Sequence, residues 1–139
     1  MKQLFHEVKI NTEGQGLYDF TKETKTWISN QKINNGILNI NILHTSASLV
    51  IQENADPDVL HDLKIFFNKL APMNNKLYKH NAEGKDDMPA HIKSALTNNQ
   101  ITLSVKKKKL ILGTWQALYL FEHRIEKHTR TLSHHLMGE

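Results

Sequence analysis

Residues 37–53 read ILNINILHTSASLVIQE, and this stretch decides how the rest of the chain is interpreted. In its first half Leu38, Ile40, Ile42 and His44 alternate with their neighbours, so they share one face of an extended strand. Its β-branched residues favour a strand as well. The polar letters HTSAS interrupt the apolar pattern with one imidazole and three hydroxyls. We therefore predict β structure that carries a reactive polar segment.

Helices and further strands are predicted on both sides of this stretch. Asp56 before Pro57 is typical of a helix start, because Asp caps the first turn and Pro fits the first helical position. Helices are expected from Asp19 to just before Asn34, from Pro57 to Ala71 and from Asp87 to Asn98. Strands are expected over residues 4–10, 101–105, 110–122 and 129–132, with loop at 11–16 and a frayed end at His134 and His135. Helices interspersed among hairpin-forming strands indicate the α+β class.

The composition indicates one folded domain over residues 1–139. Of these 139 residues, 39% are apolar and 23% are charged, which excludes disordered and collagen-like chains. A chain of this length can bury about two-thirds of its unfolded surface, so it can hold a core without cross-links. Cysteine is absent, which excludes disulfides, thiolate zinc sites and a cysteine nucleophile.

The charge and hydropathy of the chain limit the classes of binding partner that we expect. The formal net charge of +4 tolerates anionic ligands but does not demand nucleic acid. The four lysines at 106–109 are too short a patch to indicate a nucleic-acid partner, and we interpret them as a hairpin turn. No apolar run approaches the roughly 20 residues that span a bilayer, and no signal peptide is evident. We expect a cytoplasmic protein with no membrane association.

Two polar clusters could carry chemistry. In the first, His44, Thr45 and Ser46 offer hydroxyls and an imidazole suited to a phosphate or carboxylate, although a strand end with satisfied hydroxyls would look the same. The second cluster offers nitrogen and oxygen ligands for zinc, manganese or magnesium: His80, Glu83, Asp86, Asp87 and His91. The ten residues between its histidines match no compact zinc motif, and Asp86 with Asp87 would also serve as helix caps.

A third cluster lies in the predicted strand at 110–122. Gln116 and Glu122 would share an apolar face, with Trp115 on the opposite face and Arg124 at the strand end, ready for an anion. Polar side chains on an apolar face need partners or line a pocket. The alternative is an edge-facing side of the sheet with Trp115 filling the core.

The motifs HTSASLVIQEN, ADPDVLHDL, YKHNAEGKDDMPAHIKSAL and LGTWQALYLFEHR, in this order from residue 44 to 124, resemble the YjbQ family, also called UPF0047. The resemblance implies a single compact α+β domain of packed, mostly antiparallel sheets with two or three helices, which associates as a homotrimer. It also implies a weak, secondary thiamine phosphate synthase activity. That reaction joins an aminopyrimidine diphosphate to a thiazole phosphate and releases pyrophosphate.

The resemblance also implies site residues. The expected catalytic groups are His44, His91 and Glu122. The expected substrate and phosphate ligands are Thr45, Ser46, Glu53, Asp62, Gln116 and Arg124, and the metal candidates are His80, His91, Glu83, Asp86 and Asp87. We expect a divalent metal (Zn, Mg or Mn), no organic cofactor and a small phosphorylated ligand. The competing hypothesis is a metal- or small-anion-binding protein whose synthase activity is incidental.

The chain departs from the family pattern at three positions. Ser104 stands where the family usually has proline, and Lys108 stands where it has glycine in a turn. Phe121 replaces a common glycine before Glu-His-Arg. The first two changes affect a hairpin, whereas the third would narrow any pocket beside Glu122.

Overall fold

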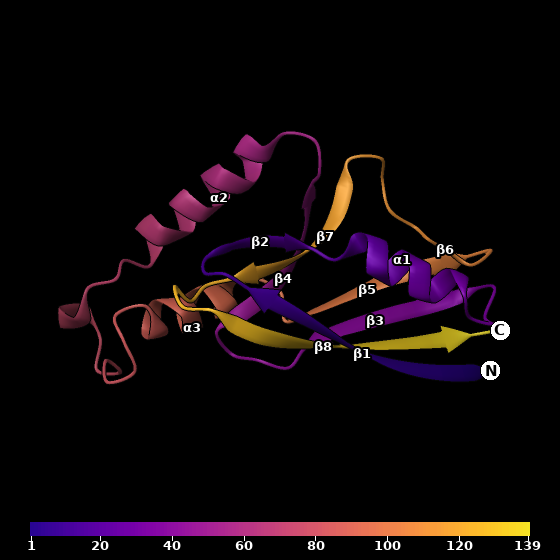
Figure 1. The fold of residues 1–139 in the computed structure, drawn as a ribbon, viewed down its shortest axis with the longest axis horizontal. Coiled ribbons are helices and arrows are strands. Elements are labelled where there is room, and N and C mark those ends of the chain that lie inside the picture. Colours follow the sequence, from indigo (N-terminus) through magenta and orange to yellow (C-terminus); the bar gives the residue numbers. More distant parts are fainter.

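The computed structural model describes all 139 residues and contains two antiparallel sheets and three α-helices (Figure 1). The larger sheet has the order β1-β8-β3-β5-β6, and the smaller one has the order β2-β7-β4. The strands are β1 (Lys2–Thr12), β2 (Gly16–Asp19), β3 (Gly36–Ile42), β4 (Ala47–Glu53), β5 (Gln100–Lys106), β6 (Lys109–Leu110), β7 (Gln116–Glu122) and β8 (His128–Gly138). The helices are α1 (Thr21–Ser29), α2 (Pro57–Leu70) and α3 (Asp87–Leu96), with a short 3-10 turn at Asn75–Leu77. The predicted α+β class with antiparallel sheets is confirmed.

The larger sheet is organised around β8, which pairs with β1 on one side and β3 on the other. Its pairing with β1 runs without a break from Lys2 opposite Gly138 to Thr12 opposite His128. Along β8 every second side chain is buried, and these side chains include Leu132 and Leu136. This period of two is what one-sided burial of a strand produces.

The smaller sheet is organised around β7, whose residues from Ala117 to Glu122 are all buried. It pairs with β2 and β4, and the register places Glu122 opposite Ala47 and Gln116 opposite Glu53. Apolar residues of both sheets form the core, and Leu38, Ile40, Leu49, Leu118 and Leu120 have no exposed surface. Burial of each such side chain stabilises the fold by about 1.5–3 kcal/mol.

The helices differ in how they meet this core. In α1, Thr24 and Ile28 are buried, and α3 buries residues that include Asp87 and Lys93. By contrast, α2 has no buried residue and extends away from the sheets in Figure 1. The predicted cap of α2 is confirmed, because the Asp56 carboxylate accepts a hydrogen bond from the Asp58 amide. No helix of the chain is long and apolar enough to cross a membrane.

Several predicted boundaries are wrong. Loop was predicted over 11–16 and then a helix from Asp19, but β1 continues to Thr12 and β2 precedes α1. Asp19 lies in β2, and its carboxylate still accepts a hydrogen bond from the Thr21 amide at the helix start. The predicted strand 110–122 is two strands, because residues 111–115 leave the sheet and Trp115 is 64% exposed rather than core.

The end of the chain is also more regular than predicted. The strand expected at 129–132 runs to Gly138, and His134 lies fully buried within it instead of in a frayed end. Thr and His occupy several positions of β8. Buried and exposed residues therefore do not alternate between apolar and charged types, and the strand pattern is hard to detect in the sequence. Gly36 and Gly138 pair at this end of the sheet, where the two backbones lie too close for a side chain. A Cβ on Gly36 would lie 2.0 Å from the Met137 carbonyl oxygen.

Candidate functional site

The first residue of α3, Asp87, lies between two histidines. One of its carboxylate oxygens, Oδ2, is 2.6 Å from His80 Nε2 and 3.2 Å from His91 Nε2. His91 follows Asp87 by one helical turn, so both side chains lie on the same face of α3. The loop before α3 supplies His80. One ligand atom from each of the three residues lies within 4.8 Å of the others, close enough for the three to reach one cation. We call these three residues the histidine cluster.

Arg124, just after β7, is hydrogen-bonded to the loop that leads into α3 and to the first residue of this helix. Its Nη1 donates to the second oxygen of Asp87, and its Nε donates to Asp86 Oδ2 at 2.9 Å. Its Nη2 donates to the Glu83 carbonyl oxygen at 2.9 Å. Burial opposes ionisation of Asp87, but the hydrogen bond from His80 and the charge of Arg124 outweigh it and lower its pKa. Asp87 is therefore a carboxylate, held in place by Arg124.

His91 is oriented by a backbone group. Its Nδ1 lies 3.0 Å from the Thr45 carbonyl oxygen, which can only accept a hydrogen bond. Nδ1 must therefore carry a proton, and in a neutral ring Nε2 has a lone pair that faces the Asp87 carboxylate. Two acceptors at 3.2 Å repel each other unless a proton or a metal ion lies between them. A histidine that donates its other N–H to a carbonyl oxygen is the usual arrangement of a metal ligand.

A second cluster surrounds Glu122 at the end of β7, where this residue has no exposed surface. Arg130 Nε donates to Glu122 Oε1 at 2.7 Å, and Thr12 Oγ1 donates to the same oxygen at 2.7 Å. Arg130 Nη2 and the backbone amides of His123 and Arg124 donate to the other oxygen. Burial raises the pKa of Glu122, but these hydrogen bonds, first that of Arg130, lower it overall. Glu122 is thus a buried carboxylate that positions Arg130, with no lone pair open to solvent.

The segment 44–46 lies against Arg130. Ser46 Oγ accepts a hydrogen bond from Arg130 Nη2 at 3.0 Å, and His44 Nδ1 is 3.5 Å from Arg130 Nη1. Burial and the Arg130 charge lower the pKa of His44, so the neutral ring is favoured. Thr45 is exposed at the surface between them. The segment therefore touches the Glu122 cluster through His44 and Ser46, and the histidine cluster through the Thr45 carbonyl.

Three of the predicted ligands lie elsewhere. Glu53 and Gln116 face each other at the opposite end of β4 and β7 from Glu122, about 20 Å away at the rise of an extended strand. Gln116 Oε1 accepts a hydrogen bond from the Gly113 amide at 2.7 Å, so it closes a local turn. Asp62 is exposed on α2, beside His61. None of the three contacts the histidine cluster. Glu83 reaches the site through its carbonyl oxygen on Arg124.

Sequence reasoning missed several polar groups next to the site. Arg130 was assigned only to a short strand, although an arginine inside an alternating strand is a signal for a buried partner. Lys93 is 2% exposed and donates to Asn68 Oδ1 at 2.5 Å, and burial lowers its pKa to about 8. His123 is buried and lies 2.8 Å from Ser48 Oγ, and burial lowers its pKa to about 3. The buried face expected for this helix, with Ile92, Ala95 and Leu96, is wrong, because Ala95 and Leu96 are exposed. The buried residues are instead Asp87, Pro89, Ala90 and Lys93, whose helical spacing could have revealed this lysine.

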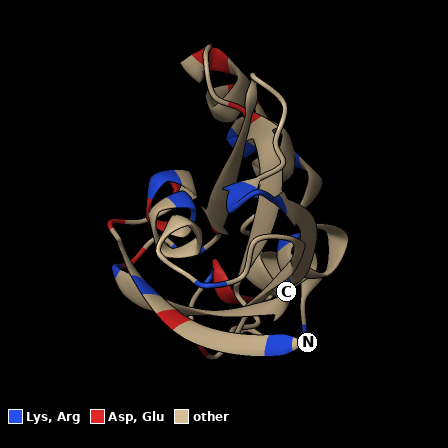
Figure 2. Cartoon of the chain, turned by 90° about the vertical axis from the view of Figure 1, so that its right-hand side faces the viewer, with Lys and Arg blue, Asp and Glu red and all other residues tan.

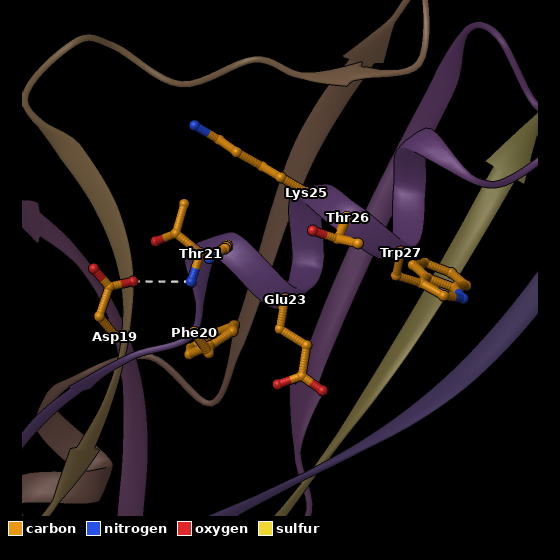
Figure 3. Close-up of a pocket in the computed structure, with 8 residues that line it drawn as sticks. Asp19, Phe20, Thr21, Glu23, Lys25, Thr26 and Trp27 are labelled. Carbon is orange, nitrogen blue, oxygen red and sulfur yellow. Dashed lines mark hydrogen bonds between the residues drawn. The ribbon is translucent and has the colours of Figure 1, made fainter.

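The cavities of the chain lie apart from the histidine cluster. The largest, about 830 Å³, is lined by residues from Asp19 to Trp27 along α1 (Figure 3). None of the four cavities is lined by a residue of the histidine cluster. In Figure 2 the colours for Lys and Arg and for Asp and Glu occur together on single elements, including the strand that starts at the N-terminus.

Comparison with known proteins places the chain in a family. The family model described as "UPF0047 protein YjbQ-like" matches residues 6–139. A UPF0047 protein of Synechocystis sp. is 45% identical over 130 residues, which cover 94% of this chain and 88% of that protein. The YjbQ protein of Escherichia coli O157:H7 is 39% identical over 131 residues, 94% of each chain.

Solved structures show the same fold. A conserved hypothetical protein from Thermus thermophilus is 30% identical with a TM-score of 0.85, over 95% of this chain and 99% of that one. A YbjQ-like protein of unknown function from Sulfolobus solfataricus P2 is 22% identical with a TM-score of 0.86, over 99% and 100% of the two chains, and supports the fold alone. On the family model and the curated relatives, this chain belongs to the YjbQ family, UPF0047.

Proposed function

We propose that His80, Asp87 and His91 bind a divalent metal ion, and that the protein acts there on a small phosphorylated molecule. The observation that carries this proposal is the position of His91, whose Nε2 lies 3.2 Å from the Asp87 carboxylate while Nδ1 is held by the Thr45 carbonyl oxygen. This contact requires a proton or a metal ion between the two atoms, and a metal ion would take both of them as ligands.

The donor set fits a transition metal. Two imidazole nitrogens with one carboxylate oxygen suit zinc or manganese, whereas magnesium prefers oxygen ligands alone. Arg124, which is itself held by Asp86, supports the set, because it donates to Oδ1 of Asp87 and leaves Oδ2 facing the histidines. When bound, such an ion supplies charge stabilisation for a departing diphosphate.

The specific reaction we propose is the synthase reaction that the family resemblance implies. The bond between the pyrimidine methylene carbon and a diphosphate oxygen breaks, and its electron pair leaves on pyrophosphate. The thiazole ring nitrogen then forms the new bond to that carbon, which gives thiamine phosphate. In this scheme the hydroxyls of Thr45 and Ser46 bind phosphate oxygens, and the neutral ring of His44 donates a hydrogen bond to one of them. Glu122 takes no part in bond making and holds Arg130 in place.

One observation favours the competing function, a metal- or small-anion-binding protein. The histidine cluster lies outside the four cavities of the chain, whereas enzyme sites are usually concave. Turnover separates the two candidates. Metal-loaded protein should release pyrophosphate from the two substrates at about 1 per second or faster if it is a dedicated enzyme. A rate far below this value, unchanged by substitutions in the histidine cluster, would favour the binding protein.

We also propose the homotrimer that the resemblance implies. Support comes from α2, whose apolar side chains Ile65, Phe66 and Leu70 are exposed in the single chain. Apolar side chains gathered on one helix favour association. Light scattering after size exclusion should give about three times the 16.1 kDa of the chain. A monomer mass would contradict this proposal.

The metal proposal is tested by elemental analysis of untagged protein purified without a chelator. We expect near-stoichiometric zinc or manganese in the natural chain and its loss in His91→Ala and Asp87→Asn. His61→Ala is the matched control, because His61 is also an exposed histidine next to an aspartate but lies on α2. Absence of metal from the natural protein, followed by failure to take up added zinc or manganese, would contradict the proposal.

A further inference from the structure

The His44 ring ends the ladder between β3 and β8. The Leu43 amide donates to the Thr131 carbonyl oxygen at 3.1 Å, and the Thr131 amide donates to His44 Nε2 at 2.8 Å. A ring carbon would not approach an amide nitrogen this closely, so the ring orientation is fixed. Because Nε2 accepts this hydrogen bond, the proton of the neutral ring must be on Nδ1.

That proton points toward another donor. Arg130 Nη1 lies 3.5 Å from His44 Nδ1, and a guanidinium nitrogen cannot accept a hydrogen bond. The Arg130 Nε and Nη2 atoms donate to Glu122, and Nη2 also reaches Ser46. Nη1 is therefore the one nitrogen of this guanidinium without an oxygen acceptor, on a residue that is 3% exposed. Buried donors are nearly always paired, so Arg130 Nη1 needs an acceptor that the chain itself does not supply.

One further donor favours an anionic acceptor, and it lies beside the histidine cluster. Ser46 Oγ accepts from Arg130, and its own hydroxyl proton has no acceptor within the chain. The Thr45 carbonyl oxygen, between His44 and Ser46, accepts from His91 of the histidine cluster. His44 and Ser46 are only partly buried, so a ligand can reach them from solvent. Three donors thus converge beside the proposed metal site.

We infer that one oxygen of a phosphate group binds between His44 Nδ1–H and Arg130 Nη1–H, with the Ser46 hydroxyl as the third donor. This inference deepens the proposed function, on which it rests for the nature of the ligand, a phosphorylated molecule. It names Arg130, and not Arg124, as the arginine that contacts the phosphate. Arg124 is already engaged by Asp86, Asp87 and the Glu83 carbonyl oxygen.

The test is an NMR titration of chelator-treated, ¹⁵N-labelled protein with inorganic phosphate. Saturable shifts are expected for the Thr131 amide, the Arg130 Nε–H and the His44 ring. Arg130→Lys keeps a cation for Glu122 but removes Nη1, and we expect it to weaken phosphate binding at least tenfold. His44→Ala should have a similar effect. Ser46→Ala leaves the ion pair intact and should weaken binding about threefold, whereas His61→Ala should bind phosphate as the natural chain does.

The outcomes separate this inference from the metal proposal. Phosphate binding that depends on His44 and Arg130 in protein that never takes up metal would support the phosphate site and contradict the metal site. Metal uptake without saturable phosphate binding would do the reverse. A ring spectrum with the proton on Nε2 of His44, or equal phosphate affinity in the natural chain, Arg130→Lys and His44→Ala, would overturn the inference.

Discussion

Two arginine–carboxylate clusters lie side by side at the end of β7. They differ in which groups contact the carboxylate oxygens that the arginine leaves free. Glu122 is paired with Arg130, and five hydrogen bonds from Arg130, Thr12 and two backbone amides fill both oxygens. Asp87 is paired with Arg124 through Oδ1, but its Oδ2 faces His80 and His91, whose side chains are 42% and 33% exposed. Both carboxylates are themselves almost fully buried.

The comparison shows that burial of a carboxylate does not by itself indicate a function. Around Glu122 a guanidinium, two backbone amides and the Thr12 hydroxyl all donate to the carboxylate, so its oxygens are already satisfied. Around Asp87 two neighbours are imidazoles, which can donate a proton or bind a metal ion. The Glu122 cluster therefore holds the architecture together, while the histidine cluster leaves an oxygen for a ligand.

The largest effect is expected from Glu122→Gln, which breaks the closed cluster. The substitution leaves the Arg130 charge buried without its partner, and loss of one member of a buried pair costs about 3–5 kcal/mol. Urea unfolding should show this loss in the free energy of unfolding. The control is Glu126→Gln on the exposed loop before β8, which should change stability by less than about 0.5 kcal/mol. A loss below about 1 kcal/mol for Glu122→Gln would show that the pair is not what holds this end of β7.

The next effect tests the open cluster through metal linkage. Zinc or manganese at about 100 times its dissociation constant should raise the free energy of unfolding of the natural chain by about 2.7 kcal/mol. His91→Ala should abolish this increase and cost less than about 1 kcal/mol in metal-free protein, because His91 is partly exposed. Denaturant unfolding with and without metal measures both quantities. An undiminished metal effect in His91→Ala would mean that the ion binds elsewhere.

His134 sharpens the comparison as a buried titratable group without any charged partner. Its Nε2 contacts Thr24 Oγ1 at 2.9 Å, its Nδ1 has no hydrogen-bond partner, and burial lowers its pKa to about 4. Between pH 6.5 and pH 4 the unfolded chain binds this proton and the folded chain does not. Stability from this group is therefore present above pH 6.5 and is lost as the pH falls through this window.

We expect the loss from His134 to be about 2 kcal/mol between pH 7 and pH 4.5. His134→Phe should remove that share of the pH dependence while costing little at pH 7, since the ring lies among Phe20, Trp27 and His6 and Thr24 still donates to the Phe20 carbonyl oxygen. Unfolding free energies of both proteins at the two pH values test this. Parallel pH curves for the two proteins would show that His134 titrates alike in the folded and unfolded states.

The sequence predicted the kinds of residue in the site better than their arrangement. His80, Asp87 and His91 lie close together in the sequence, and a helix start brings Asp87 and His91 onto one face, so local pattern was enough to predict that they lie together in the fold. Arg130 reaches Glu122 only because β8 returns beside β1 and β3, and no local pattern contains that pairing. The β2 strand was missed for another reason, since a strand of four residues that begins at Gly16 carries too short a signal.

Glu53, Asp62 and Gln116 were predicted as ligands, but in this chain they lie away from the histidine cluster. Each lies within or beside a motif of the family, but the register of β4 with β7 places Glu53 and Gln116 at the far end of the strands from Glu122. Residue type and motif membership do not specify which end of a strand faces a site. Register does, and it depends on pairing between segments that are more than 60 residues apart.

The smallest effects are therefore expected at these positions. Asp62→Asn on exposed α2 should change stability by less than about 0.5 kcal/mol, and Gln116→Ala should cost about 1 kcal/mol through its bond to the Gly113 amide. Neither should change metal content or phosphate affinity, which elemental analysis and the phosphate titration measure. If either substitution weakened metal or phosphate binding tenfold while the protein stayed folded, these residues would have to meet the site of another subunit. The sites of the assembly would then be shared between chains, and the contrast between the two arginine–carboxylate clusters would describe only half of each site.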